Sequence, residues 1–147
     1  MKIHGTDERC LDSIAKNGFR IPTSFKCTNS DGKLTFGKAI YFSSYSSKAD
    51  RYSHGKKPVL IVADVLLGKV KICSDSILDY TPERAQQDGI NTIYFDGDAV
   101  NKERSLIHGK DVDEYAFYNT EQVYPKYAIF FEIIGLNEEN LYFQYTG

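Results

Sequence analysis

The stretch FGKAIYFSSYSSKADRY, residues 36–52, decides how the rest of the chain is interpreted. Its first four residues are typical of a turn, and residues 40–42 then favour a short strand on a half-buried surface. The serines that follow favour a loop and a cap for one or two helical turns ending near Tyr52. A strand end followed by a short helix can place Tyr41 and Tyr52 on two walls of one cleft. Two facing tyrosines suit a flat, positively charged ring, which can stack on both π faces.

Core packing is the competing explanation for these aromatic residues. The chain contains 11 Tyr and 9 Phe among its 147 residues, so many of them must serve the core or its rim. Periodicity alone does not separate a binding tyrosine from a packing one.

Outward from this stretch, hydrophobic patterning predicts six or seven short strands and little helix. The expected strands are residues 2–3, 40–42, 58–67, 70–73, 92–95, 114–118 and 127–133. One helix is expected after a cap at Thr6 or Asp7, with an apolar stripe of Cys10, Leu11, Ile14 and Ala15 and an end at Gly18. Another is expected to begin at Pro82. Residues 58–67 are apolar and β-branched enough for a central strand, and residues 22–35 read as a long surface loop. The pattern predicts an α+β domain built on a split, mixed sheet.

The composition favours no charged partner. The 18 basic and 20 acidic residues leave a net charge of -2, so neither nucleic acid nor a membrane surface has compositional support. No apolar run approaches the roughly 20 residues that span a bilayer, and no leader pattern opens the chain, so we expect an intracellular protein, cytoplasmic or nuclear.

The cysteines and histidines lack the spacing of a metal site, so no metal is expected and the thiols are interpreted as reduced and mostly buried. These residues are Cys10, Cys27, Cys73, His4, His54 and His108.

The C-terminal segment contains ENLYFQ, residues 139–144, which spells the recognition sequence of a protease used to remove tags. We interpret residues 137–147 as a tag remnant and residues 1–136 as a single domain.

Five short motifs then occur in a fixed order. They are HGT at 4–6, FGKAIYFS at 36–43, SK at 47–48, VLLG at 65–68, and EY at 114–115 followed by EQVYPKY at 121–127. Together they resemble the catalytic domain of the poly(ADP-ribose) polymerase family, within the diphtheria-toxin-like ADP-ribosyltransferases. The resemblance covers nearly all of residues 3–134 and includes Gly18 and Arg20 at family-like distances after His4.

The resemblance implies a split β-sheet core with an NAD⁺ cleft. The family's His-Tyr-Glu signature falls on His4, Tyr41 and Glu114. It further implies that the Gly5 backbone holds the nicotinamide carboxamide and that Tyr41 and Tyr52 flank the ring.

The resemblance also implies the remaining contacts with NAD⁺. His4 and Thr6 would contact the ribose hydroxyls, and Arg20 would lie near the adenosine or a phosphate. Phe42 and Ser47 complete the expected NAD⁺-binding set, and residues 22–35 would form the donor loop.

The chemistry agrees with this assignment. Breaking the nicotinamide N-glycosidic bond builds positive charge on the ribose C1′, so a carboxylate such as Glu114 helps most in the transition state. His4 is expected to position the ribose as a hydrogen-bond donor with an ordinary pKa.

Two positions depart from the family pattern. Ala39 stands where the family usually has glycine before Ile-Tyr, which costs little if the backbone there is extended. Ala49 stands where many members have a serine for the carboxamide, so a hydrogen bond of about 1 kcal/mol is lost unless Ser47 substitutes.

The sequence therefore predicts an NAD⁺-dependent ADP-ribosyltransferase that moves single ADP-ribose units from NAD⁺, as substrate, to a protein acceptor and releases nicotinamide. A silent NAD⁺ or ADP-ribose binding module and an NAD⁺ glycohydrolase are the alternatives. Transfer to nucleic acid would require a basic rim near Arg51, Lys56 and Lys57.

Overall fold

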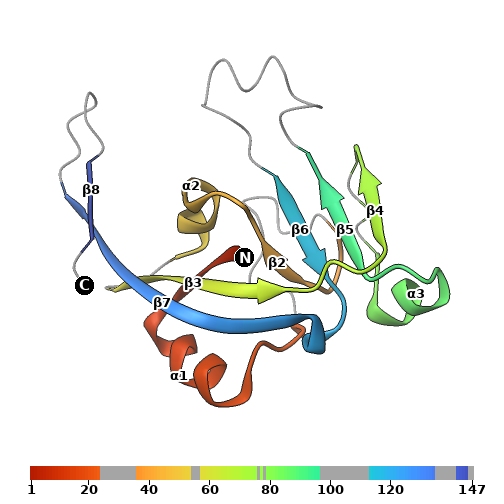
Figure 1. Cartoon of the computed structure of the whole chain (residues 1–147), viewed down its shortest axis with the longest axis horizontal. Coiled ribbons are helices and arrows are strands. Elements are labelled where there is room, and N and C mark those ends of the chain that lie inside the picture. The colour runs from red at the N-terminus through yellow and green to blue at the C-terminus, as the bar shows by residue number, and fades with distance from the viewer. Residues whose placement is uncertain are drawn as a thin grey trace.

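The computed structural model describes residues 1–23, 36–53, 57–75, 77, 79–96, 113–134 and 142–145. These residues form two four-stranded sheets (Figure 1). The first has the order β1-β3-β7-β8, with β1 at Lys2–Asp7, β3 at Pro58–Val65, β7 at Val123–Ile134 and β8 at Tyr142–Tyr145. The second has the order β2-β6-β5-β4, with β2 at Ile40–Phe42, β6 at Glu114–Phe117, β5 at Thr92–Phe95 and β4 at Val70–Cys73. Only β4 and β5 pair in parallel among these strands.

Short helices cover the sheets. They are α1 at Glu8–Asn17, α2 at Ser46–Ala49, a 3₁₀ turn at Asp50–Tyr52, α3 at Pro82–Gln87 and a second 3₁₀ turn at Thr120–Gln122. Figure 1 shows α1 and α2 on opposite sides of the first sheet and α3 beside β4. The α+β class with a split, mixed sheet is confirmed, as are β2, β4, β5 and the start of α3 at Pro82.

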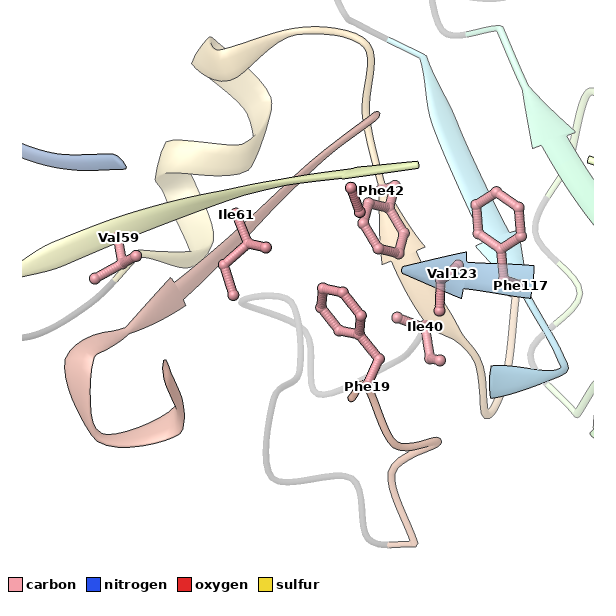
Figure 2. Close-up of a cluster of buried hydrophobic side chains, with 8 residues drawn as sticks. Phe19, Ile40, Phe42, Val59, Ile61, Phe117 and Val123 are labelled. Atoms are coloured by element: carbon pink, nitrogen blue, oxygen red, sulfur yellow. The ribbon is translucent and has the colours of Figure 1, made fainter. Parts of the chain in front are cut away.

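The core is divided by the two sheets. The largest cluster lies between them and draws side chains from both (Figure 2): Phe19, Ile40, Phe42, Val59, Ile61, Ala63, Phe117 and Val123. A second cluster contains Tyr80, Ala85, Ile93, Ala116 and Tyr118, and so lies on the other side of β5 and β6. A third, Ala49, Leu60 and Phe131, lies under α2. Because β3 supplies Val59 and Ile61 to one cluster and Leu60 to another, it is the central strand that its apolar run predicted.

Two strands are longer than predicted. β1 continues from the expected residues 2–3 to Asp7, because each of its residues is paired with β3. β7 begins at Val123 rather than 127 and includes Pro125 next to a register shift between Val62 and Ala63. In both cases a partner strand fixes an extended backbone that the local sequence signals only weakly.

Helix α1 is capped as predicted, although its apolar stripe is narrower. The Asp7 carboxylate accepts a hydrogen bond from Arg9 N at 2.8 Å, and Gly18 follows the helix with a φ of +74°. Leu11 and Ile14 pack against the largest cluster.

Cys10 and Ala15 are exposed, so the stripe prediction is wrong for these two residues of α1. The interpretation of Cys10 as a buried thiol is wrong for the same reason, whereas Cys73 is partly buried and Cys27 lies outside the described residues.

No helix in the described ranges is long and apolar enough to cross a bilayer.

Candidate active site

The site is built where the two sheets meet. Ile3 of β1 and Ser43, directly after β2, form an isolated bridge, with Ile3 N donating to Ser43 O at 2.8 Å and Ser43 N donating to Ile3 O at 2.9 Å. The bridge brings the next residue of β1, His4, beside β2. His4 Nδ1 lies 2.8 Å from Tyr41 O, so two residues of the predicted signature are joined directly.

The contacts of His4 define its chemistry. A carbonyl oxygen only accepts, so Nδ1 carries the proton and Nε2 of the neutral ring is an acceptor. Burial lowers the pKa of His4, and the bond to the Tyr41 carbonyl offsets only part of this shift. The imidazole contacts the rings of Phe19 and Phe42, at centroid distances of 5.1 and 5.4 Å. The expectation of an ordinary pKa is therefore wrong, and the nitrogen left for a ligand accepts a hydrogen bond rather than donating one.

Tyr41 and Glu114 lie on the same face of the second sheet. Tyr41 is opposite Ala116 on β6, and Glu114 precedes Ala116 by two residues, so the side chains share a face as diagonal neighbours. Glu114 is 6% exposed. Burial is the largest cause that raises the pKa of Tyr41, and the charges of Glu114 and Tyr52 raise it further, against a hydrogen bond from Phe36 N. These electrostatic interactions indicate that the side chains of Glu114 and Tyr52 both lie near that of Tyr41.

The phenol of Tyr41 is engaged by the turn at residues 36–39. Its oxygen accepts from Phe36 N at 3.0 Å, and its hydroxyl donates to Gly37 O at 2.6 Å. Tyr118 fixes the same turn by donating to Phe36 O at 2.8 Å. Because the hydroxyl is occupied, the ring of Tyr41 is the part that remains for stacking.

The backbone of Gly5 lies against the end of α2. A Cβ at Gly5 would lie 1.6 Å from Ala49 O, so no other residue fits without moving the helix. Ile3 turns its N–H and C=O toward Ser43, and by strand alternation Gly5 turns its own to the same side, away from β3. The bridge is isolated, so no ladder extends from it to Gly5. One donor and one acceptor at this position can pair with a primary amide.

The remaining predicted residues are distributed around this centre. Thr6 is 7% exposed and lies on the same face of β1 as His4, and Tyr52 is 39% exposed at the end of the 3₁₀ turn after α2. Phe42 is 2% exposed within the largest cluster, so it is buried away from a ligand and contacts the site through the ring of His4. Arg20 is exposed and donates to Ser13 Oγ at 3.2 Å.

Some predictions lie outside the described residues. Ser47 belongs to α2, but its side chain is not among the described ones. In the basic rim expected for transfer to nucleic acid, the Arg51 side chain and Lys56 also lie outside the described residues. Most of the expected donor loop, residues 24–35, lies outside them too.

Both departures from the family pattern are accommodated by packing. Ala39 is 2% exposed and has no positive φ. Ala49 is 3% exposed and packs with Leu60 and Phe131. A methyl group therefore fits each position without backbone strain.

Asp113 was missed by the sequence prediction. Its carboxylate accepts from Ser43 Oγ at 2.9 Å and from Ser44 N at 2.7 Å, and it also bonds Ser44 Oγ. The only available signal was its place directly before Glu114, because its partners lie 69 and 70 residues away in sequence.

Within the described ranges, no group of three or more His, Cys, Asp or Glu residues could hold a metal ion.

Comparison with known proteins identifies the family of the chain. Residues 1–133 match the family described as the poly(ADP-ribose) polymerase catalytic domain. The chain is also 27% identical over 157 aligned residues to a poly [ADP-ribose] polymerase tankyrase of Caenorhabditis elegans, covering 88% of this chain and 7% of that protein. The chain thus belongs to the poly(ADP-ribose) polymerase catalytic-domain family and spans a small fraction of this relative's length.

Proposed function

We propose that the chain is an NAD⁺-dependent ADP-ribosyltransferase that transfers single ADP-ribose units to a protein acceptor and releases nicotinamide. The observation that carries the proposal is the placement of Tyr41 and Glu114 on one sheet face, with His4 bonded to the Tyr41 backbone. Family membership supports the same reaction class.

In the proposed complex, the nicotinamide ring stacks between Tyr41 and Tyr52. Its carboxamide pairs with the N–H and C=O of Gly5, which the strand turns away from β3. Nε2 of His4 accepts a hydrogen bond from a ribose hydroxyl, since Nδ1 is committed to the Tyr41 carbonyl. Thr6 and Arg20 complete the contacts with the remainder of NAD⁺.

The proposed reaction breaks the bond between the ribose C1′ and the nicotinamide nitrogen. The electron pair passes to the nicotinamide ring and cancels its charge, while positive charge develops on the ribose. The Glu114 carboxylate stabilises that charge and accepts a hydrogen bond from the ribose 2′-hydroxyl. An acceptor oxygen or nitrogen then bonds to C1′ and loses its proton, for which Glu114 is the nearest proposed base.

The proposal is tested with Glu114→Gln, which keeps the shape of the side chain and removes its charge. Nicotinamide release from NAD⁺ and ADP-ribose label retained on protein are measured together. Both are expected to fall by about 10²- to 10³-fold, the usual cost of losing one group that stabilises transition-state charge. Glu132→Gln, the same change at an exposed position of β7, is the matched control and is expected to leave both unchanged.

The two measurements separate the alternatives. Nicotinamide release without retained label indicates an NAD⁺ glycohydrolase. Binding of NAD⁺ or ADP-ribose with no release indicates a silent binding module, which the absence of a serine at Ala49 favours. The size of the label, one unit or a chain, decides between single transfer and polymer.

A further inference from the structure

Asp113 ties the strand that carries Glu114 to the strand that carries Tyr41. Asp113 is only 8% exposed, and each of its two carboxylate oxygens accepts a hydrogen bond from the segment that follows β2. Lys2 Nζ donates to Ser44 Oγ at 2.6 Å, so β1 is joined to the same group of side chains.

These bonds replace strand pairing where it stops. The register between β2 and β6 ends with Phe42 opposite Tyr115, so the pairing stops one position short of Glu114. Beyond that pair, bonds from Asp113 to Ser43 and Ser44 hold the two strands together. On its other side, β6 is held at Glu114 by pairing with Phe95 of β5. On the side that faces Tyr41, strand ends without such bonds open readily, so the Asp113 carboxylate limits how far Glu114 can move relative to Tyr41.

We propose that Asp113 is a positioning residue, which fixes Glu114 at the distance from the nicotinamide site that the reaction needs. This inference rests on the proposed function. Asp113 does not touch the substrate in this scheme and acts through the strand ends alone. Its contribution belongs to the chemical step, because binding of the nicotinamide ring uses Tyr41, Tyr52 and the Gly5 backbone.

The first test compares Asp113→Ala with Asp113→Asn in nicotinamide release. Asn keeps an oxygen that accepts from Ser43 Oγ and Ser44 N, whereas Ala keeps none. Asp113→Ala is expected to lower kcat by about 10- to 100-fold, with KM for NAD⁺ changed by less than about 3-fold, since small misplacements of a catalytic group have costs of this size. Asp113→Asn is expected to stay within about 5-fold of the unmodified kcat.

Thr92→Val is the matched control. Thr92 is fully buried, donates to Leu67 O at 2.6 Å, and pairs with Phe117 at the opposite end of β6. Its removal is expected to lower stability without lowering kcat. If Asp113→Ala does not fold, Ser44→Ala at an exposed serine replaces it and is expected to lower kcat by about 2- to 5-fold.

A double-mutant cycle identifies the group through which Asp113 acts. If it acts through Glu114, then Asp113→Ala in the Glu114→Gln background is expected to leave the residual release within about 2-fold. Independent, multiplying effects would overturn the proposal. An equal loss in Asp113→Asn and Asp113→Ala would overturn it too, because it would assign the effect to charge.

Amide hydrogen exchange gives a readout independent of turnover. Asp113→Ala is expected to speed exchange at Ser44 and in β6, but not in α3. If the unmodified chain releases no nicotinamide, the proposed function fails. If Asp113→Ala speeds exchange in such an inactive chain, the bonds from Asp113 hold the strands together but its positioning role in the reaction is overturned. If Asp113→Ala leaves exchange unchanged, the structural role of those bonds is overturned as well.

Discussion

His4 is held in its neutral form by its surroundings. Phe19 and Phe42 pack against its ring, and Tyr41 O accepts a hydrogen bond from its Nδ1–H. Protonation would place a charge among aromatic side chains and convert Nε2 from an acceptor to a donor. One change in protonation therefore affects both stability and the proposed contact with the ribose.

The lowered pKa of His4 predicts a pH-dependent stability. The unfolded state binds a proton near pH 6.5 and the folded state only at lower pH, so the free energy of unfolding should fall as pH decreases below about 6.5, by at most about 1.4 kcal/mol per pH unit. Urea unfolding between pH 8 and pH 5 measures this slope. His4→Asn should be less stable at pH 8 and should lose that part of the slope. A slope that persists in His4→Asn and disappears when His54 or His108 is replaced would contradict the prediction.

At the scale of the element, the Asp7 carboxylate makes both a side-chain cap and an ion pair at the start of α1. The Asp7 carboxylate accepts from Arg9 N, and the Arg9 guanidinium also contacts it at 2.7 Å. The side chain of Arg9 is 81% exposed and that of Asp7 is 16% exposed. The cap should therefore stabilise the helix more than the ion pair does.

Asp7→Ala is predicted to lower the free energy of unfolding by about 1 kcal/mol at pH 7, and Arg9→Ala by less than about 0.5 kcal/mol. Hydrogen bonding from the Arg9 side chain is the largest cause that lowers the pKa of Asp7. The stabilisation that the ionised Asp7 carboxylate contributes is fully present above the ordinary Asp pKa of about 3.9. It is lost as pH falls from there through the lower pKa of the folded state. Chemical unfolding at pH 7 and pH 2.5 checks both values. An equal loss in both variants at pH 7 would favour the ion pair over the cap.

The elements that could be predicted from sequence are those fixed by nearby residues. In residues 36–52, Gly37 with a φ of +67° makes the turn, β-favouring residues make β2, and serines precede α2. The extents of β1 and β7 depend on β3, which is distant in sequence, so local patterning gave strands that were too short.

The same reason explains what could be predicted of the candidate site. His4, Tyr41 and Glu114 carry recognisable motifs, so they could be named from the sequence. The hydrogen bonds of Asp113 and the tautomer of His4 depend on groups that meet only in the folded chain. Their roles therefore follow from the fold and not from any local pattern in the sequence.

At the scale of the whole molecule, the two sheets meet between β1 and β2, and the described C-terminal strand lies at the far edge of the first sheet (Figure 1). β8 pairs with the end of β7, from Phe131 opposite Tyr145 to Ile134 opposite Tyr142. The family match ends at residue 133, before β8. We propose that residues 1–136 are sufficient for folding and activity.

The predicted outcome for a chain of residues 1–136 is a cooperative thermal transition no more than about 5 °C below that of the full chain, with nicotinamide release retained. A chain ending at residue 126 is the control. It lacks most of β7, which pairs with the central strand β3, and is expected not to fold. Loss of folding in the 1–136 chain would show that β8 belongs to the domain.

Because the isolated bridge between Ile3 and Ser43 joins β1 to the segment after β2 at a single residue pair, we expect the site to be intolerant of insertion on either side of that pair. One extra residue between Ile3 and Gly5 would turn every later side chain of β1 to the opposite face, and two would shift the Gly5 backbone by nearly 7 Å along the strand. The same holds between Tyr41 and Ser43. Differences in length are therefore expected away from the bridge, while the few residues around it keep a fixed spacing.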